Sequence, residues 1–156
     1  MPDLSIIIPT RNETFLQQTI NDILLHARGS FEIIVVLDGY WPEPSLKTDP
    51  RVIVLHHGTM RANHGMRASI NLGMKMARGK YVMKADGHCM FDEGFDVKLI
   101  ADCQDNWLVI PRRLRLDADN WKRHRWALSV YHPDSALVFL EKFQKEDGTR
   151  EMPRIR

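Results

Sequence analysis

The feature that most constrains the fold of this chain is a pair of short apolar runs with a helical pattern between them. Residues 4–9 (LSIIIP) and 31–37 (FEIIVVL) are nearly continuous apolar stretches rich in β-branched side chains. Such runs are typical of strands that are buried on both faces of a parallel sheet. Between them, residues 15–28 place apolar side chains at helical spacing, and Gly29 follows as a helix stop. The pattern predicts a strand–helix–strand unit with parallel strands.

The same alternation continues along the chain to residue 111. We expect further strands at residues 51–55, 80–85 and 107–111, and helices at residues 65–78 and 91–103. The complete pattern predicts an α/β fold of three layers, α/β/α, around a Rossmann-like, mostly parallel sheet.

The periodicity weakens after residue 111. Residues 135–143 (SALVFLEKF) fit a helix or a strand, and residues 144–156 resemble a polar tail. We therefore expect one domain, with an α/β core at residues 1–115 and a short basic C-terminal extension of it at residues 116–156.

Charge and length narrow the class of partner. The chain has 156 residues, enough for one domain with a sizeable core, and a net charge of only +2. This mild positive charge suits an anionic small molecule, and no nucleic acid is expected. The basic segment 112–125 contains Trp121, and we interpret its charges as phosphate contacts or solvated side chains.

Features that would direct the chain to another compartment are missing from the sequence. The cysteines, Cys89 and Cys103, are too few for a disulfide framework. The first residues lack the basic and apolar regions of a signal peptide, and no apolar run reaches the ~20 residues of a membrane span. We expect a cytoplasmic location without a transmembrane segment, and any contact with a membrane would be peripheral.

Polar loops follow three of the expected strands. They contain residues 10–13, Asp38 with Gly39, and residues 86–88. Ligands of such sheets bind outside the carboxyl ends of the strands. These loops, separated in sequence, are therefore expected to form one crevice.

Asp86 and His88 are the candidate metal ligands of this crevice. Carboxylate and imidazole groups two residues apart, at the end of a buried strand, can share a divalent cation such as Mn²⁺ that in turn holds a diphosphate. The alternative is an Asp-Gly turn followed by a surface histidine. His124 or His132 is a possible third ligand, and the sequence favours neither. The histidines of residues 56–64 lack the spacing of a structural zinc site.

Asp38, Arg67 and Asn71 are further candidates for nucleotide contacts. Asp38 follows a buried strand, where its carboxylate could accept a hydrogen bond from a base or ribose, or could simply stabilise the turn with Gly39. Arg67 and Asn71 lie four residues apart on one helix face, with Arg67 in the first turn, where anions are favoured. The alternative for this second pair is a solvated helix face.

Four segments in this order resemble the nucleotide-sugar-binding half of GT-A glycosyltransferases. The resemblance covers roughly residues 4–115. It is strongest to the family 2 enzymes and to the polypeptide N-acetylgalactosaminyltransferases, in which the metal motif is Asp-x-His followed by Cys. The segments are residues 5–13 (SIIIPTRNE), 32–39 (EIIVVLDG), 65–71 (GMRASIN) and 85–89 (ADGHC).

The resemblance implies a metal-dependent glycosyltransferase with a UDP-sugar donor and Mn²⁺ or Mg²⁺ as cofactor. It implies that Asp38 contacts the uracil, that Asp86 faces the ribose or the metal, and that His88 ligates the metal. The transferred group would be a hexosyl or N-acetylhexosaminyl group. The residues expected to line the nucleotide site are Pro9, Thr10, Arg11, Glu13, Asp38, Arg67, Asn71 and Asp86.

The sequence matches the family less well on the acceptor side of the site. Members of the family continue well past the fifth strand, where inverting enzymes carry a catalytic base. Here Asp117 and Asp119 are the candidates for the base. The acceptor, whether glycan, lipid or peptide, stays open, and a homo-oligomer could complete the site. The alternative is a non-catalytic or truncated nucleotide-sugar-binding module.

Overall fold

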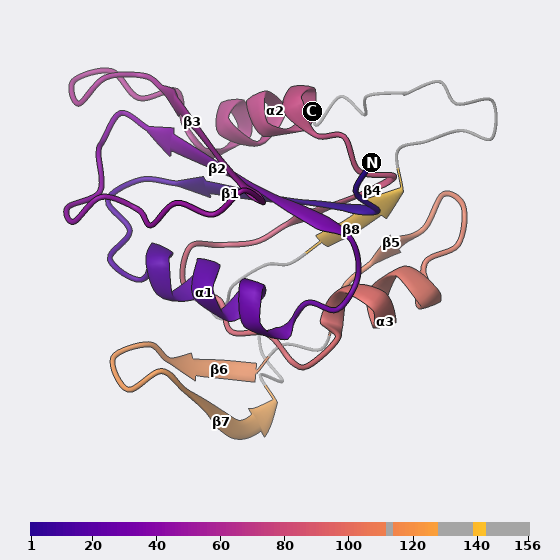
Figure 1. Ribbon diagram of the computed structural model, residues 1–156. Helices are drawn as coiled ribbons and strands as arrows, with labels where there is room; N and C mark the ends of the chain where they lie inside the picture. The colour runs from indigo at the N-terminus through magenta and orange to yellow at the C-terminus, as the bar shows by residue number, and fades with distance from the viewer. Residues whose placement is uncertain (112–113, 128–138, 143–156) are drawn as a thin grey trace.

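The structure of the protein is a computed structural model that describes residues 1–111, 114–127 and 139–142 (Figure 1). Its helices are α1 (Leu16–His26), α2 (Met66–Met76) and α3 (Phe95–Asp102). Its strands are β1 (Leu4–Thr10), β2 (Phe31–Asp38), β3 (Val52–His57), β4 (Tyr81–Lys84), β5 (Leu108–Val109), β6 (Leu114–Asp117), β7 (Lys122–Ala127) and β8 (Phe139–Lys142).

The main sheet has the strand order β3-β2-β1-β4-β8-β5. Strands β3, β2, β1 and β4 are parallel to their neighbours, whereas β8 is antiparallel to both β4 and β5. Helix α2 covers one face of this sheet, and α1 and α3 cover the other (Figure 1). The expected three-layer α/β fold with a mostly parallel sheet is confirmed.

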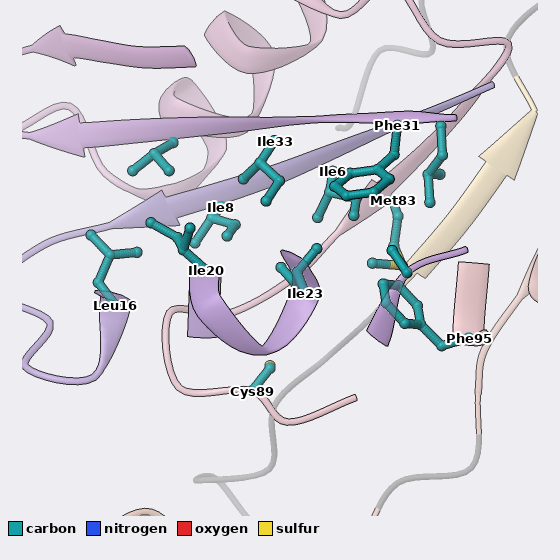
Figure 2. Packing of buried hydrophobic residues seen from close by; sticks show 14 of the residues in the cluster. Ile6, Ile8, Leu16, Ile20, Ile23, Phe31, Ile33, Met83, Cys89 and Phe95 are labelled. Atoms are coloured by element: carbon teal, nitrogen blue, oxygen red, sulfur yellow. The ribbon is translucent and has the colours of Figure 1, made fainter. Parts of the chain in front are cut away.

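The two faces of the sheet follow from the alternation of side chains along β1 and its neighbours. Ile6 and Ile8 pair in register with Ile33 and Val35 of β2, and all four belong to the core beneath α1 and α3 (Figure 2). Ile7 points the other way, into the smaller core beneath α2. Because both faces are covered, the central strands need apolar side chains at nearly every position.

Helix α2 packs unusually close to the sheet. A Cβ atom added at Gly73 would lie 2.6 Å from Cγ2 of Ile7, closer than real side chains approach. Glycine therefore allows this approach.

Among the helices that the structure describes, none is both long and apolar enough to cross a membrane.

The strand that separates β4 from β5 comes from a segment whose structure the sequence left open. The segment 135–143, left open as helix or strand, contributes β8, which pairs Leu140 with Met83 on one side and Val109 on the other. The fifth strand is therefore not the neighbour of the fourth. Residues 143–156, including the expected tail, lie outside the described residues.

Other boundaries also shift. His56 and His57 belong to the end of β3 and not to the loop that follows it. The helix expected at residues 91–103 begins only at Phe95, after Gly94 in the left-handed region with a φ of 64°. Part of the basic segment forms the hairpin β6–β7, which lies beyond α1 from the sheet (Figure 1).

Candidate functional site

The carboxyl ends of β1, β2 and β4 meet at one edge of the sheet. Thr10 pairs in register with Leu37, and Ile7 pairs with Lys84. The polar loops that follow these strands therefore lie side by side, as the sequence predicted. Two contacts join them: the hydroxyls of Thr10 and Tyr40 lie 2.9 Å apart, and Glu13 contacts His88.

Helix α1 fixes the loop that carries the candidate metal ligands. The Thr19 hydroxyl donates to the carbonyl of Gly87 at 2.7 Å and accepts from the N–H of Cys89 at 3.0 Å. A Cβ atom at Gly87 would lie 2.5 Å from Cγ of Glu13, so this position requires glycine while Glu13 keeps its place. The loop of residues 86–88 is therefore held against the loop of residues 10–13, and it carries the partly exposed His88 side chain.

Glu13 and His88 form a hydrogen-bonded pair. Nδ1 of His88 lies 2.8 Å from Oε2 of Glu13, and 38% of the His88 side chain is exposed. The hydrogen bond to Glu13 raises the pKa of His88 and lowers that of Glu13, although burial opposes both shifts. This contact fixes the orientation of the imidazole and leaves Nε2 as the ring nitrogen that can face a ligand.

Lys84 and Asp86 form a second pair on the same loop. Lys84 is the last residue of the buried strand β4, with its side chain 10% exposed, and its ammonium donates to Oδ1 of Asp86. Lys84 was not among the predicted site residues. A charged residue ending a buried apolar strand is the signal that could have identified it.

Asp86 and His88 are the side chains at this edge that could hold a divalent cation. Asp86 already attracts a positive group, and His88 presents an oriented imidazole. Within the described residues, no three His, Cys, Asp or Glu side chains are grouped to hold a metal ion. Of the possible third ligands, His124 lies on β7, where its side chain is not described, and His132 lies outside the described residues.

Asp38 is engaged in holding the loop before α2. Its two carboxylate oxygens accept the N–H groups of His64 at 2.9 Å and Gly65 at 2.7 Å, and Nε2 of His57 lies 3.5 Å from Oδ1. Burial raises the pKa of Asp38, but the two backbone hydrogen bonds and the nearby histidines outweigh it, and the net pKa is lowered. A Cβ atom at Gly58 would come within 2.7 Å of Oδ1. Asp38 therefore shapes this loop, whatever else it contacts.

Thr10 and Arg11 lie next to the same loop. Burial raises the pKa of Tyr40, whose hydroxyl contacts Thr10. This tyrosine was not among the predicted site residues, although it directly follows the Asp-Gly turn at the end of β2. With the amide oxygen of Asn63 facing Arg11, that oxygen accepts a hydrogen bond from the guanidinium at 3.2 Å. Pro9, half-buried, pairs in register with Val36.

Arg67 and Asn71 are both exposed on α2. Arg67 lies in the first turn after Gly65, whose Cβ position is open within 4 Å, so a ligand could approach the backbone there. The structure brings neither side chain into hydrogen bonding with another described residue.

The candidates for a catalytic base lie on the hairpin β6–β7. Asp117 accepts hydrogen bonds from the backbone N–H and the amide of Asn120, at 3.2 and 2.9 Å, so it stabilises the turn. Asp119 is exposed in the same turn. The turn packs against α1 through Trp121, whose indole N–H lies 3.4 Å from Oδ1 of Asp22. No contact described here joins Asp117 or Asp119 to Asp86.

Cys89 follows His88 but is not a reactive group. It is buried, and burial raises the pKa of its thiol to about 12, so it stays protonated at neutral pH. Both Cys89 and Cys103 are free thiols, as expected.

Curated relatives of this chain are described as glycosyltransferases. EpsJ, described as an uncharacterized glycosyltransferase of Bacillus subtilis (strain 168), is 33% identical over 118 residues, which cover 70% of this chain and 33% of EpsJ. An uncharacterized glycosyltransferase of Rickettsia conorii is 32% identical over 94 residues, which cover 56% of this chain and 15% of the relative. The chain thus spans about a third, or less, of the length of these relatives.

A solved structure shares the fold. The crystal structure of S. aureus TarS 1-349 in complex with UDP-GlcNAc aligns with a TM-score of 0.52 and 21% identity, over 64% of this chain and 30% of that one. The family model for glycosyl transferase family 2 matches residues 5–152. The parallel sheet, the loops gathered at its carboxyl edge and this match over more than half of the sequence together show that the chain belongs to glycosyl transferase family 2.

Proposed function

We propose that this chain binds a UDP-sugar and a divalent cation, Mn²⁺ or Mg²⁺, and transfers a hexosyl or N-acetylhexosaminyl group to an acceptor. The observation that carries the proposal is the placement of Asp86 and His88, each held by a charged partner, at the carboxyl edge of the sheet beside Thr10 and Glu13. The likeness in fold to TarS, solved in complex with UDP-GlcNAc, supports this class of donor. The narrower likeness to the polypeptide N-acetylgalactosaminyltransferases stays a prediction.

Asp86 and His88 would hold the cation, with diphosphate and water oxygens completing its shell because two protein ligands are too few. Bound there, the cation would neutralise charge on the leaving diphosphate. Glu13 would keep the His88 imidazole oriented.

The nucleotide would lie along the loops next to this pair. Pro9, Thr10, Arg11 and Glu13 would border the uridine. Asp38 would act largely by fixing the loop of residues 58–65, since both of its oxygens accept backbone N–H groups from that loop. Arg67 and Asn71 would contribute from the first turns of α2, and the exposed Arg67 would meet a phosphate.

A nucleotide-sugar-binding module without catalysis is the second candidate. It is favoured by the turn-stabilising role of Asp117, a candidate base, whose carboxylate accepts two hydrogen bonds from Asn120. This candidate predicts UDP binding without turnover of any UDP-sugar. Cation-dependent hydrolysis or transfer would exclude it.

Isothermal titration with UDP tests the proposed site. We expect UDP to bind tightly only with Mn²⁺, and Asp86→Ala or His88→Ala to weaken this binding by about 100-fold or more. Asp102→Ala, an exposed carboxylate of α3, is the matched control and should bind like the parent. UDP affinity that is indifferent to chelator and to both site substitutions would contradict the proposal.

The donor can then be identified by thermal shift with a panel of UDP-sugars and Mn²⁺. A ligand that binds only the native state raises the melting temperature in proportion to the logarithm of its concentration over Kd. The preferred sugar should give the largest shift.

A further inference from the structure

Lys84 carries a charge where the sheet otherwise buries apolar side chains. All four residues of β4 are buried, and Lys84 lies in register with Ile7, whose side chain is fully buried in the core beneath α2. An ammonium in such a place needs an ionic or hydrogen-bonding partner. Its partner is the carboxylate of Asp86, one of the two proposed cation ligands.

We propose that Lys84 is the resting counter-ion of Asp86, and that its presence makes binding of the divalent cation depend on the diphosphate of the nucleotide. The inference rests on the proposed function, and it assigns a role to a residue outside the proposed ligands. Lys84 acts as a positioning residue, because it sets the charge that Asp86 presents.

The balance of charge around the site supports this role. Four ionisable groups make two pairs here, Lys84 with Asp86 and Glu13 with His88. A divalent cation that enters alone must compete with the ammonium for Asp86 and is repelled by it. The carboxylate of Glu13 is already engaged by His88, and among the described residues no three His, Cys, Asp or Glu side chains are grouped to hold a metal ion.

A nucleotide diphosphate removes this obstacle. Its oxygens bring negative charge and can accept the hydrogen bonds of the displaced ammonium, which has three donors on a flexible stem. Asp86 is then available to the cation. Cation and nucleotide should therefore bind cooperatively, and each should raise the affinity of the other by the same factor.

The test measures Mn²⁺ binding by the paramagnetic resonance signal of the free ion, with and without UDP. The parent chain should bind Mn²⁺ weakly alone and about tenfold or more tightly with UDP. Lys84→Met keeps the length of the side chain without its charge. It should bind Mn²⁺ alone about tenfold more tightly than the parent, and its enhancement by UDP should be smaller by about the same factor, since only ligation by the diphosphate remains.

Lys84→Arg, which keeps the charge, should behave like the parent. Thermal melting of each variant checks that it is folded, and Lys84→Gln is a second neutral variant should Lys84→Met fail to fold. Equal affinities of the parent and both neutral variants for Mn²⁺ alone would overturn the inference and leave the proposed function intact. Absence of any Mn²⁺-dependent UDP binding by the parent would overturn the proposed function itself.

Discussion

The hydrogen bond between Glu13 and His88 joins residues that are 75 positions apart in the sequence. It works together with Gly87, where a side chain would strike Glu13, so that Glu13 and Gly87 together fix the imidazole of His88. The Lys84–Asp86 pair lies on the same loop. At the scale of residues, the site is thus built from charged groups that orient each other before any ligand is bound.

Glu13→Gln should lower the pKa of His88 toward its ordinary value, because the hydrogen bond to Glu13 is the main cause of the raised pKa. Titration of the His88 ring signals by nuclear magnetic resonance measures this change. Glu93→Gln, which alters an exposed ion pair with Arg28, is the control and should leave His88 unchanged. An identical His88 titration in Glu13→Gln and the parent would contradict the assignment of this contact.

The same pair predicts a window of pH in which it stabilises the fold. Because folding raises the pKa of His88, this residue stabilises the fold at pH values below its ordinary pKa of 6.5. The stabilisation is lost as the pH rises through the pKa of His88 in the folded protein. Because folding lowers the pKa of Glu13, this residue stabilises the fold at pH values above its ordinary pKa of 4.5. The stabilisation is lost as the pH falls through the pKa of Glu13 in the folded protein. Thermal melts should therefore show the largest loss of stability on Glu13→Gln between about pH 4.5 and pH 6.5. Because the pair is partly exposed, that cost is about 1 kcal/mol or less.

Helices position the site through contacts that are specific to each element. Helix α1 holds the loop of Asp86 and His88 through Thr19, and α2 begins at the loop that Asp38 holds. The close approach of α2 to the sheet depends on Gly73, which lies against Ile7 of β1. The position of Arg67 therefore depends on packing two turns further along the same helix.

Gly73→Ala should destabilise the protein by about 1 kcal/mol, and by no more than about 2 kcal/mol. Overpacking against Ile7 costs about 1–3 kcal/mol, and the better helix propensity of alanine returns about 1 kcal/mol of this. Urea denaturation measures the change. Lys75→Ala, exposed on the same helix, should stay within about 0.5 kcal/mol of the parent. A Gly73→Ala variant as stable as this control would show that α2 does not pack as closely as described.

The main sheet contains one strand, β8, that comes from late in the sequence. Strand β8 runs antiparallel between β4 and β5, so the strand that leads to Asp86 is an interior strand and not an edge. The end of β4 is thereby paired on both sides, with β1 and β8. The rigidity of the Asp86 loop should therefore depend on chain that is distant in sequence.

Leu140→Pro tests the place of β8. Leu140 pairs with Met83 and Val109, and proline removes its N–H donor and blocks an interior strand. We expect a loss of more than about 2 kcal/mol in guanidinium denaturation. Leu140→Val keeps the donor and should cost far less. Equal stability of the two variants would place β8 outside the sheet.

The acceptor and the assembly of the protein also belong to this scale. The chain spans about a third of EpsJ, so the acceptor, a homo-oligomer and a cytoplasmic or peripheral membrane location stay predictions. The division of the domain into a core and a basic extension at residue 116 also stays a prediction.

The central sheet and the place of the site follow from the order of the amino acids. Continuous apolar runs such as residues 31–37 can be buried only between two layers, and parallel strands bring their carboxyl ends to one edge. The tertiary structure alone decided that β8 enters the sheet and that Lys84 partners Asp86. The short segment of β8 fits a helix or a strand locally, and only the open edges of β4 and β5 select the strand. Likewise, Glu13 shows no local sign of His88, because contacts across 75 residues leave no periodicity in a single sequence.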